Sequence, residues 1–171
     1  MRALISALLC CALAGAFPAT ATERRGPEAT PGSNAAARTP ALGWPLDPPP
    51  APVRPFEAPE HAYGPGHRGV DLAGAAGQPV LAAADGSVVF AGRLADRELV
   101  SIEHAGGLRT SYEPVHPSVK VGERVTEGQP IGRLQPGHCP APCLHWGARE
   151  GDAYLDPLAL LGRGGVRLLP W

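Results

Sequence analysis

Between about residue 54 and residue 161 the chain is divided into short runs rich in apolar and β-branched residues, each bounded by glycine, proline or aspartate. Short runs separated by turn residues are typical of β-strands. The pattern predicts strands at residues 69–73, 79–82, 87–92, 99–104, 108–115, 130–134 and 143–149. It indicates a single all-β domain of antiparallel sheets, of a common size for one hydrophobic core.

Two turns and one helix complete this prediction. Ala105-Gly106-Gly107 lies between two predicted strands and favours a hairpin, and Asp85-Gly86 favours a second turn. Residues 156–161 are the only helical candidate, because Asp156 can cap the segment and Pro157 suits its first turn.

The first 21 residues have the pattern of a secretory signal peptide. Arg2 precedes an apolar run at residues 3–16, and Ala19-Thr20-Ala21 resembles a cleavage site. The apolar run is too short and wrongly flanked for a membrane span, and Leu9 before Cys10 is too large for a lipoprotein processing site. We expect a secreted, extracytoplasmic protein.

A proline-rich segment connects this signal peptide to the domain. Residues 22–40 lack apolar periodicity and predict a disordered tether. Eight prolines between Pro40 and Pro59 exclude a helix or a central strand and favour an extended lead-in, which Trp44, Leu46, Val53 and Phe56 can pin to the domain. The predicted organisation is signal peptide 1–21, disordered linker 22–53, domain 54–162 and C-terminal tail 163–171.

The charge is nearly balanced, with 15 basic and 16 acidic residues and a net charge of -1. This balance gives no electrostatic reason to expect nucleic acid or an anionic membrane as a partner.

Cleavage after Ala21 would leave Cys139 and Cys143 as the cysteines of the mature chain. An oxidising compartment favours a disulfide between them. The alternatives are two free thiols, or half of a zinc site made with His138 and His145.

His67, Asp71 and His145 are candidate metal ligands. In a straight strand, His67 and Asp71 would lie about 13 Å apart, so sharing a metal requires a bend, which Gly66 and Gly69 permit. Two histidines and one aspartate with a fourth position open to water match the stoichiometry of a catalytic zinc site. Taken singly, each residue is more typical of solvated surface, and Asp71 could instead cap a turn.

Four motifs in order resemble the lysostaphin and LytM type of zinc metallopeptidase. They are His67-Arg68-Gly69-Val70-Asp71, the alanine-rich segment 82–92, Leu144-His145-Trp146-Gly147, and Tyr154-Leu155-Asp156-Pro157-Leu158. The resemblance covers nearly all of the predicted domain. It implies antiparallel sheets with a groove across them, one zinc ion held by His67, Asp71 and His145, and activity on the peptide cross-links of bacterial peptidoglycan at the cell wall.

The chain departs from that family at two positions. Family members carry one assisting histidine two residues before the last zinc ligand, where this chain has Cys143, and another after the Tyr-x of a Tyr-x-His motif, where it has Pro114. Loss of a general base or an oxyanion donor typically lowers rates by about 10² to 10⁴. His116 and His138 are weak substitutes, and in a regular strand Glu113 faces away from the site.

Two hypotheses follow. The protein is either a peptidoglycan metallo-endopeptidase with an atypical assisting group, or a catalytically degenerate module that binds cell-wall peptides or regulates another cell-wall hydrolase. The retained ligands and the missing histidines leave the enzyme assignment open and lean slightly toward the second hypothesis.

Overall fold

The computed structural model describes residues 39–61 and 64–162, all within one compact unit. The predicted signal peptide, the first part of the linker (22–38) and the predicted C-terminal tail lie outside the described residues. Within the described ranges, no helix is both long and apolar enough to cross a membrane.

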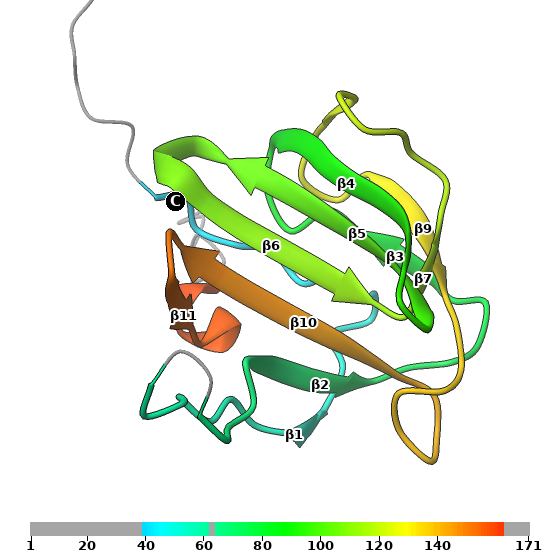
Figure 1. The fold of residues 1–171 in the computed structure, drawn as a ribbon. Coiled ribbons are helices and arrows are strands. Elements are labelled where there is room, and N and C mark those ends of the chain that lie inside the picture. Colours follow the sequence, from blue (N-terminus) through cyan, green and yellow to red (C-terminus); the bar gives the residue numbers. More distant parts are fainter. Residues whose placement is uncertain (1–38, 62–63, 163–171) are drawn as a thin grey trace, which may run out of the picture. The chain divides into compact units, whose positions relative to one another are not determined.

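The fold consists of two antiparallel sheets (Figure 1). The larger has the strand order β1-β2-β10-β6-β5-β4-β8, with β11 paired to β10, and the smaller has the order β3-β9-β7. The larger sheet is built from β1 (Pro52–Arg54), β2 (Gly69–Ala73), β4 (Gly86–Leu94), β5 (Arg97–His104), β6 (Leu108–Glu113), β8 (Arg124–Val125), β10 (Cys143–Glu150) and β11 (Ala153–Leu155). The smaller is built from β3 (Pro79–Leu81), β7 (Val115–Pro117) and β9 (Pro130–Leu134). The predicted all-β, antiparallel class is confirmed.

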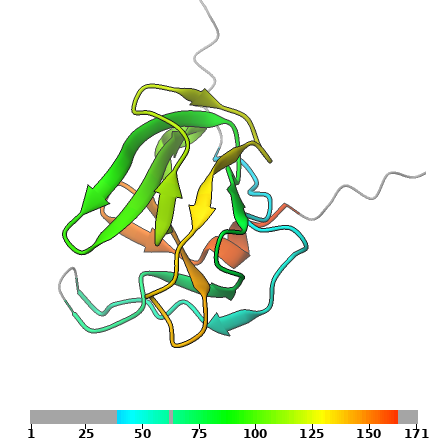
Figure 2. The ribbon, with the colours of Figure 1, turned by 90° about the vertical axis from the view of Figure 1, so that its right-hand side faces the viewer.

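Side-chain alternation along the strands separates a core face from a groove face. In β6, Leu108, Thr110 and Tyr112 are buried, whereas the residues between them are only partly buried. The core joins both sheets: Leu144 and Trp146 of β10 belong to the same apolar cluster as residues of the smaller sheet. Figure 2 shows β9, in yellow, beside the larger sheet. The opposite face of β10, β2 and β6 is therefore available for chemistry.

The ordered domain begins earlier than the predicted boundary at residue 54. Leu42 and Leu46 are buried in the core, and the backbone N–H groups of Leu42 and Gly43 donate to the carbonyls of Leu160 and Ala83, at 2.8 and 2.6 Å. Residues 39–53 are thus packed onto the fold rather than disordered, because two leucines are enough to anchor a segment that prolines already hold extended. Val53, expected as an anchor, is 57% exposed.

The predicted strands 69–73 and 130–134 coincide with β2 and β9. The predicted strand 108–115 divides into β6 and β7 at Pro114, which has no N–H to donate to a sheet. The predicted helix is a short 3-10 helix, η2 (Pro157–Leu160), capped by Asp156, whose carboxylate accepts from the Leu158 N–H at 2.9 Å. The hairpin contains a 3-10 turn, η1 (Ala105–Gly107). The sequence pattern missed β1, β8 and β11, which are two or three residues long.

Candidate metal centre

Three neighbouring strands place acidic and imidazole side chains in one row. His145 of β10 lies opposite Asp71 of β2 on one side and opposite Glu113 of β6 on the other. Directly opposed residues of antiparallel strands project to the same face of the sheet. Asp71, His145 and Glu113 therefore share the groove face.

His67 enters the row from the segment before β2. Its N–H donates to the Glu57 carbonyl at 2.8 Å, and its carbonyl accepts from the Glu57 N–H at 3.0 Å. These bonds bring residue 57 so close that a Cβ atom on Gly66 would lie 2.7 Å from the Glu57 carbonyl oxygen. Glycine at 66 therefore allows the bend that carries His67 back over Asp71, as the four-residue spacing requires.

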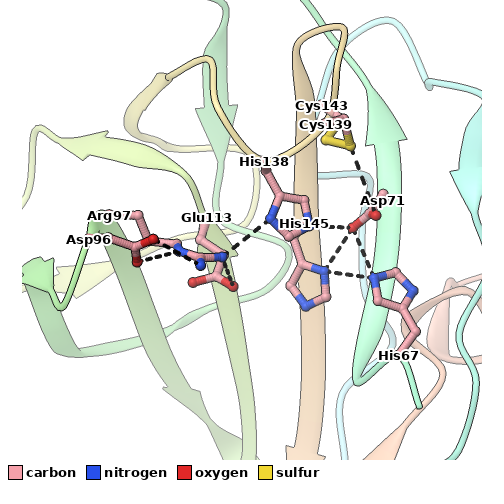
Figure 3. Close-up of polar contacts among 9 residues, drawn as sticks. All are labelled: His67, Asp71, Asp96, Arg97, Glu113, His138, Cys139, Cys143 and His145. Carbon is pink, nitrogen blue, oxygen red and sulfur yellow. Dashed lines mark hydrogen bonds and ion pairs between the residues drawn. A yellow bond between two sulfur atoms is a disulfide. The ribbon is translucent and has the colours of Figure 1, made fainter. Parts of the chain in front are cut away.

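The three candidate ligand atoms converge (Figure 3). Nε2 of His67 lies 3.0 Å from Oδ1 of Asp71 and 3.0 Å from Nδ1 of His145, and the last two atoms are 2.8 Å apart. Ligands bound tetrahedrally to zinc at their usual distances lie about 3.3 Å from one another. The structure thus brings the predicted set together at separations close to those of a metal site.

The tautomer of His67 explains why these atoms fit a cation. Nδ1 of His67 lies 2.7 Å from the Pro55 carbonyl oxygen, which can only accept, so Nδ1 carries the proton. In the neutral ring, Nε2 then presents a lone pair to the Asp71 carboxylate and to His145. A backbone carbonyl that fixes the outer nitrogen in this way is the usual support of a metal-bound histidine.

Burial and charge act in opposition at the site. Burial raises the pKa of Asp71, but the hydrogen bond and charge of His145 and the charges of His67 and His138 outweigh it, so the pKa of Asp71 lies below its usual value. Burial lowers the pKa of His145, although Asp71 opposes this shift. An ionised carboxylate and a neutral imidazole are the protonation states that metal ligands require.

His138, which the sequence offers only as a weak substitute, lies at the same site. Its Nε2 is 3.1 Å from Oδ1 of Asp71, and the four candidate ligand atoms of His67, Asp71, His138 and His145 lie within 4.8 Å of one another. It comes from the loop before β10, next to Cys139. In the structure Cys139 and Cys143 form a disulfide, so neither offers a thiolate to a metal.

The other positions that the sequence analysis considered do not join this cluster of ligand atoms. Pro114 and Cys143, at the two assisting positions, are both buried. His116 projects outward from β7, is 65% exposed and bonds Glu98 at 2.7 Å. The expectation for Glu113 is wrong: it faces the groove, because Tyr112 occupies the core side of β6 and sets the alternation of the strand.

Two hollows lie beside this centre. One, of about 500 Å³, includes Asp71, His138 and the loop that follows it in its lining. The other, of about 370 Å³, includes Glu113, His145 and Tyr154. Asp71 lines the first hollow and His145 the second, and these two residues are hydrogen-bonded to each other, so both hollows adjoin the candidate metal centre.

Known proteins of similar sequence were found in several bacteria. An uncharacterized protein of Mycobacterium tuberculosis is 51% identical over 170 residues, which cover 95% of this chain and 62% of that protein. The chain thus spans less than two thirds of that relative. The DD-carboxypeptidase/endopeptidase Mpg of Neisseria meningitidis is 33% identical over 96 residues, covering 55% of this chain and 22% of that protein.

Solved structures with the same fold include two peptidases. A zinc-containing peptidase from Vibrio cholerae superposes with a TM-score of 0.60 at 26% identity, covering 71% of this chain and 40% of that one. The catalytic domain of the antimicrobial peptidase lysostaphin from Staphylococcus simulans gives a TM-score of 0.56 at 27% identity, covering 64% of this chain and 90% of that one. The sequence profile of Peptidase family M23 matches residues 65–157, more than half of the chain, and the protein belongs to that family.

Proposed function

We propose that the protein is a secreted, zinc-dependent endopeptidase that acts on the peptide cross-links of bacterial peptidoglycan. Membership of Peptidase family M23 supports a metallopeptidase-type domain, and the similarity to the Neisseria DD-carboxypeptidase/endopeptidase supports a cell-wall peptide as substrate. The predicted signal peptide supports an extracytoplasmic location.

The observation that carries the proposal is the convergence of the lone pair of His67 Nε2 with Asp71 and His145, at separations of 2.8–3.0 Å, beside two hollows. We assign one zinc ion to these three residues. When bound, zinc supplies Lewis acidity that polarises a peptide carbonyl and lowers the pKa of water. The residues of the chain contribute the orientation: Pro55 holds His67, and the strand register holds Asp71 opposite His145.

A second candidate function is a binding module that recognises cell-wall peptides or regulates another hydrolase without turnover. It is favoured by the two assisting positions, where Pro114 is buried and Cys143 is bridged. Against it, Glu113 faces the groove opposite His145, and His138 approaches Asp71. We therefore rank hydrolysis first.

The test measures zinc content and peptidoglycan digestion on the same purified mature protein. Zinc is quantified by elemental analysis, and soluble muropeptides from purified peptidoglycan are identified by mass spectrometry. The endopeptidase proposal expects about one zinc per chain and new muropeptides from the wild type, and the loss of both in His67→Ala and Asp71→Ala.

The matched control is His116→Ala, which removes an exposed histidine of β7 that is bonded to Glu98 and is not among the proposed ligands, and it should change neither readout. Zinc without any product would favour the binding module. A wild type that lacks zinc after incubation with the metal would refute the proposed ligand set.

A further inference from the structure

The structure leaves the family's two assisting positions without a histidine, yet it brings another histidine to the metal centre. Nε2 of His138 lies 3.1 Å from Oδ1 of Asp71, and the side chain is 18% exposed. His138 and Asp71 line the same hollow of about 500 Å³. The His138 side chain therefore lies next to both the candidate metal centre and any ligand bound in this hollow.

The other ring nitrogen of His138 faces a permanent cation. Nη1 of Arg97 lies 3.4 Å from Nδ1 of His138 (Figure 3). A guanidinium donates hydrogen bonds and cannot accept them. Nδ1 of His138 must therefore be the accepting nitrogen, and in the neutral ring the proton resides on Nε2, where it points toward Asp71.

His67 and His138 are consequently opposite tautomers beside the same carboxylate. His67 meets a carbonyl acceptor at Nδ1 and presents a lone pair at Nε2, which suits a metal ligand. His138 meets a cationic donor at Nδ1 and presents an N–H at Nε2, which suits hydrogen-bond donation. Metal binding through Nε2 of His138 would require a proton on Nδ1, directed against Arg97.

Arg97 is itself held from two sides. Its Nε donates to Oδ1 of Asp96 at 3.1 Å, and its Nη1 lies 3.8 Å from Oε1 of Glu113. Arg97 begins β5 and Glu113 ends β6, so the guanidinium is fixed to the sheet that carries His145. These exposed ion pairs add little stability, but they direct the guanidinium toward His138.

The disulfide fixes the backbone of His138. Cys139 follows it directly and is joined to Cys143, the first residue of β10, across a sequence separation of four. Cys143 is paired in register with Ala73 of β2, two residues from Asp71. The loop therefore begins and ends beside the candidate centre, and the bridge limits how far His138 can move from it.

From these contacts we infer that His138 is the assisting residue of this site and that Arg97 is the positioning residue that holds its tautomer. The inference rests on the proposed zinc endopeptidase function. When a peptide occupies the hollow, His138 turns its Nε2–H from the Asp71 carboxylate to the peptide carbonyl oxygen, and this hydrogen bond strengthens as negative charge develops on that oxygen. No net proton transfer is needed for this role.

The experiment compares His138→Ala with the wild type for zinc affinity and for steady-state release of muropeptides from purified peptidoglycan. Loss of one oxyanion donor lowers kcat by about 10²- to 10³-fold. We expect a loss in that range, with KM and zinc affinity changed less than about threefold, and partial recovery in His138→Gln, whose amide retains an N–H donor. His116→Ala is the matched control and should match the wild type.

The role of Arg97 is tested by a measurement that would not change if Arg97 only stabilised the fold. ¹⁵N NMR of the zinc-loaded protein distinguishes protonated from unprotonated imidazole nitrogens, and we expect His138 to be protonated on Nε2. Arg97→Ala should lower kcat and weaken this tautomer preference, whereas Arg97→Lys should retain more of both. Cys139→Ala/Cys143→Ala should lower kcat with zinc retained, because the loop is released.

Each failure has a distinct signature. A zinc affinity reduced tenfold or more in His138→Ala, or an unprotonated Nε2, would make His138 a ligand and overturn the inference. Unchanged turnover in His138→Ala beside an active wild type would overturn it while leaving the endopeptidase proposal intact. A zinc-loaded wild type that releases no muropeptides would overturn both.

Discussion

Gly69 is the residue at which the backbone of β2 makes room for the side chain of His145. A Cβ atom at position 69 would lie 2.7 Å from Nε2 of His145 and 2.6 Å from the carbonyl oxygen of Trp146. The second contact is with the backbone of a buried strand, which cannot move away at low cost. The absence of a side chain at 69 is therefore part of the candidate site.

We predict that Gly69→Ala displaces the His145 ring and weakens zinc binding by about 10- to 100-fold, the usual cost of disturbing the surroundings of a metal ligand. Competition with a chromophoric chelator measures the affinity, and circular dichroism checks that the strands persist. Gly43→Ala is the control, because its new Cβ would meet chiefly the end of the Glu127 side chain, which is exposed and can rotate away. Equal affinities in both variants would disprove this role of Gly69.

At the scale of elements, a buried hydrogen-bond network joins β5 and β6 to the turn before β4. Nδ1 of His104 donates to the Asp85 carbonyl at 2.9 Å, which leaves Nε2 to accept from the Thr110 hydroxyl at 2.7 Å. Thr110 is hydrogen-bonded in turn to the Tyr112 hydroxyl, which accepts from the Ala83 N–H. Burial raises the pKa of Tyr112 to about 12, so its hydroxyl stays neutral in this network.

Burial also lowers the pKa of His104. Above about pH 6.5 this residue is neutral in both the folded and unfolded states, and its contribution to stability is complete. As the pH falls below that value, the unfolded chain binds the proton first, so the free energy of unfolding decreases. We predict a smaller decrease between about pH 7.5 and pH 5 in His104→Gln than in the wild type, as measured by denaturant titration. Identical pH slopes in the two proteins would contradict this account.

The sequence could predict elements wherever local pattern decides them. The runs that became β2 and β9 have clear bounds in turn residues, and Asp156-Pro157 marks the start of η2. The short strands β1, β8 and β11 could not be predicted, because two or three residues carry no periodicity and form strands only when a partner strand lies alongside.

The residues of the candidate site likewise divide into those that sequence motifs could predict and those that only the fold reveals. His67, Asp71 and His145 stand in recognisable motifs, and the structure places them together. The face of Glu113 could not be predicted, because the alternation of β6 depends on the burial of Tyr112, which the sequence does not show. Arg97 gave no signal, since it lies 41 residues before His138 in the sequence and meets it only through the folding of β5 against the loop before β10.

At the scale of the whole molecule, the lead-in, residues 40–59, closes one side of the core rather than tethering it. Leu46 is 1% exposed and lies in the same apolar cluster as residues of both sheets.

Truncating a buried leucine to alanine typically costs about 2–5 kcal/mol, because apolar contact is lost and a cavity remains. We predict a loss of this size in the free energy of unfolding for Leu46→Ala in the full chain. Val53→Ala alters the same lead-in at a side chain that is 57% exposed and should change stability by less than about 0.5 kcal/mol. Denaturant titration of both variants decides the question: two small effects would mean that the domain begins near residue 54 and that the lead-in is only a tether.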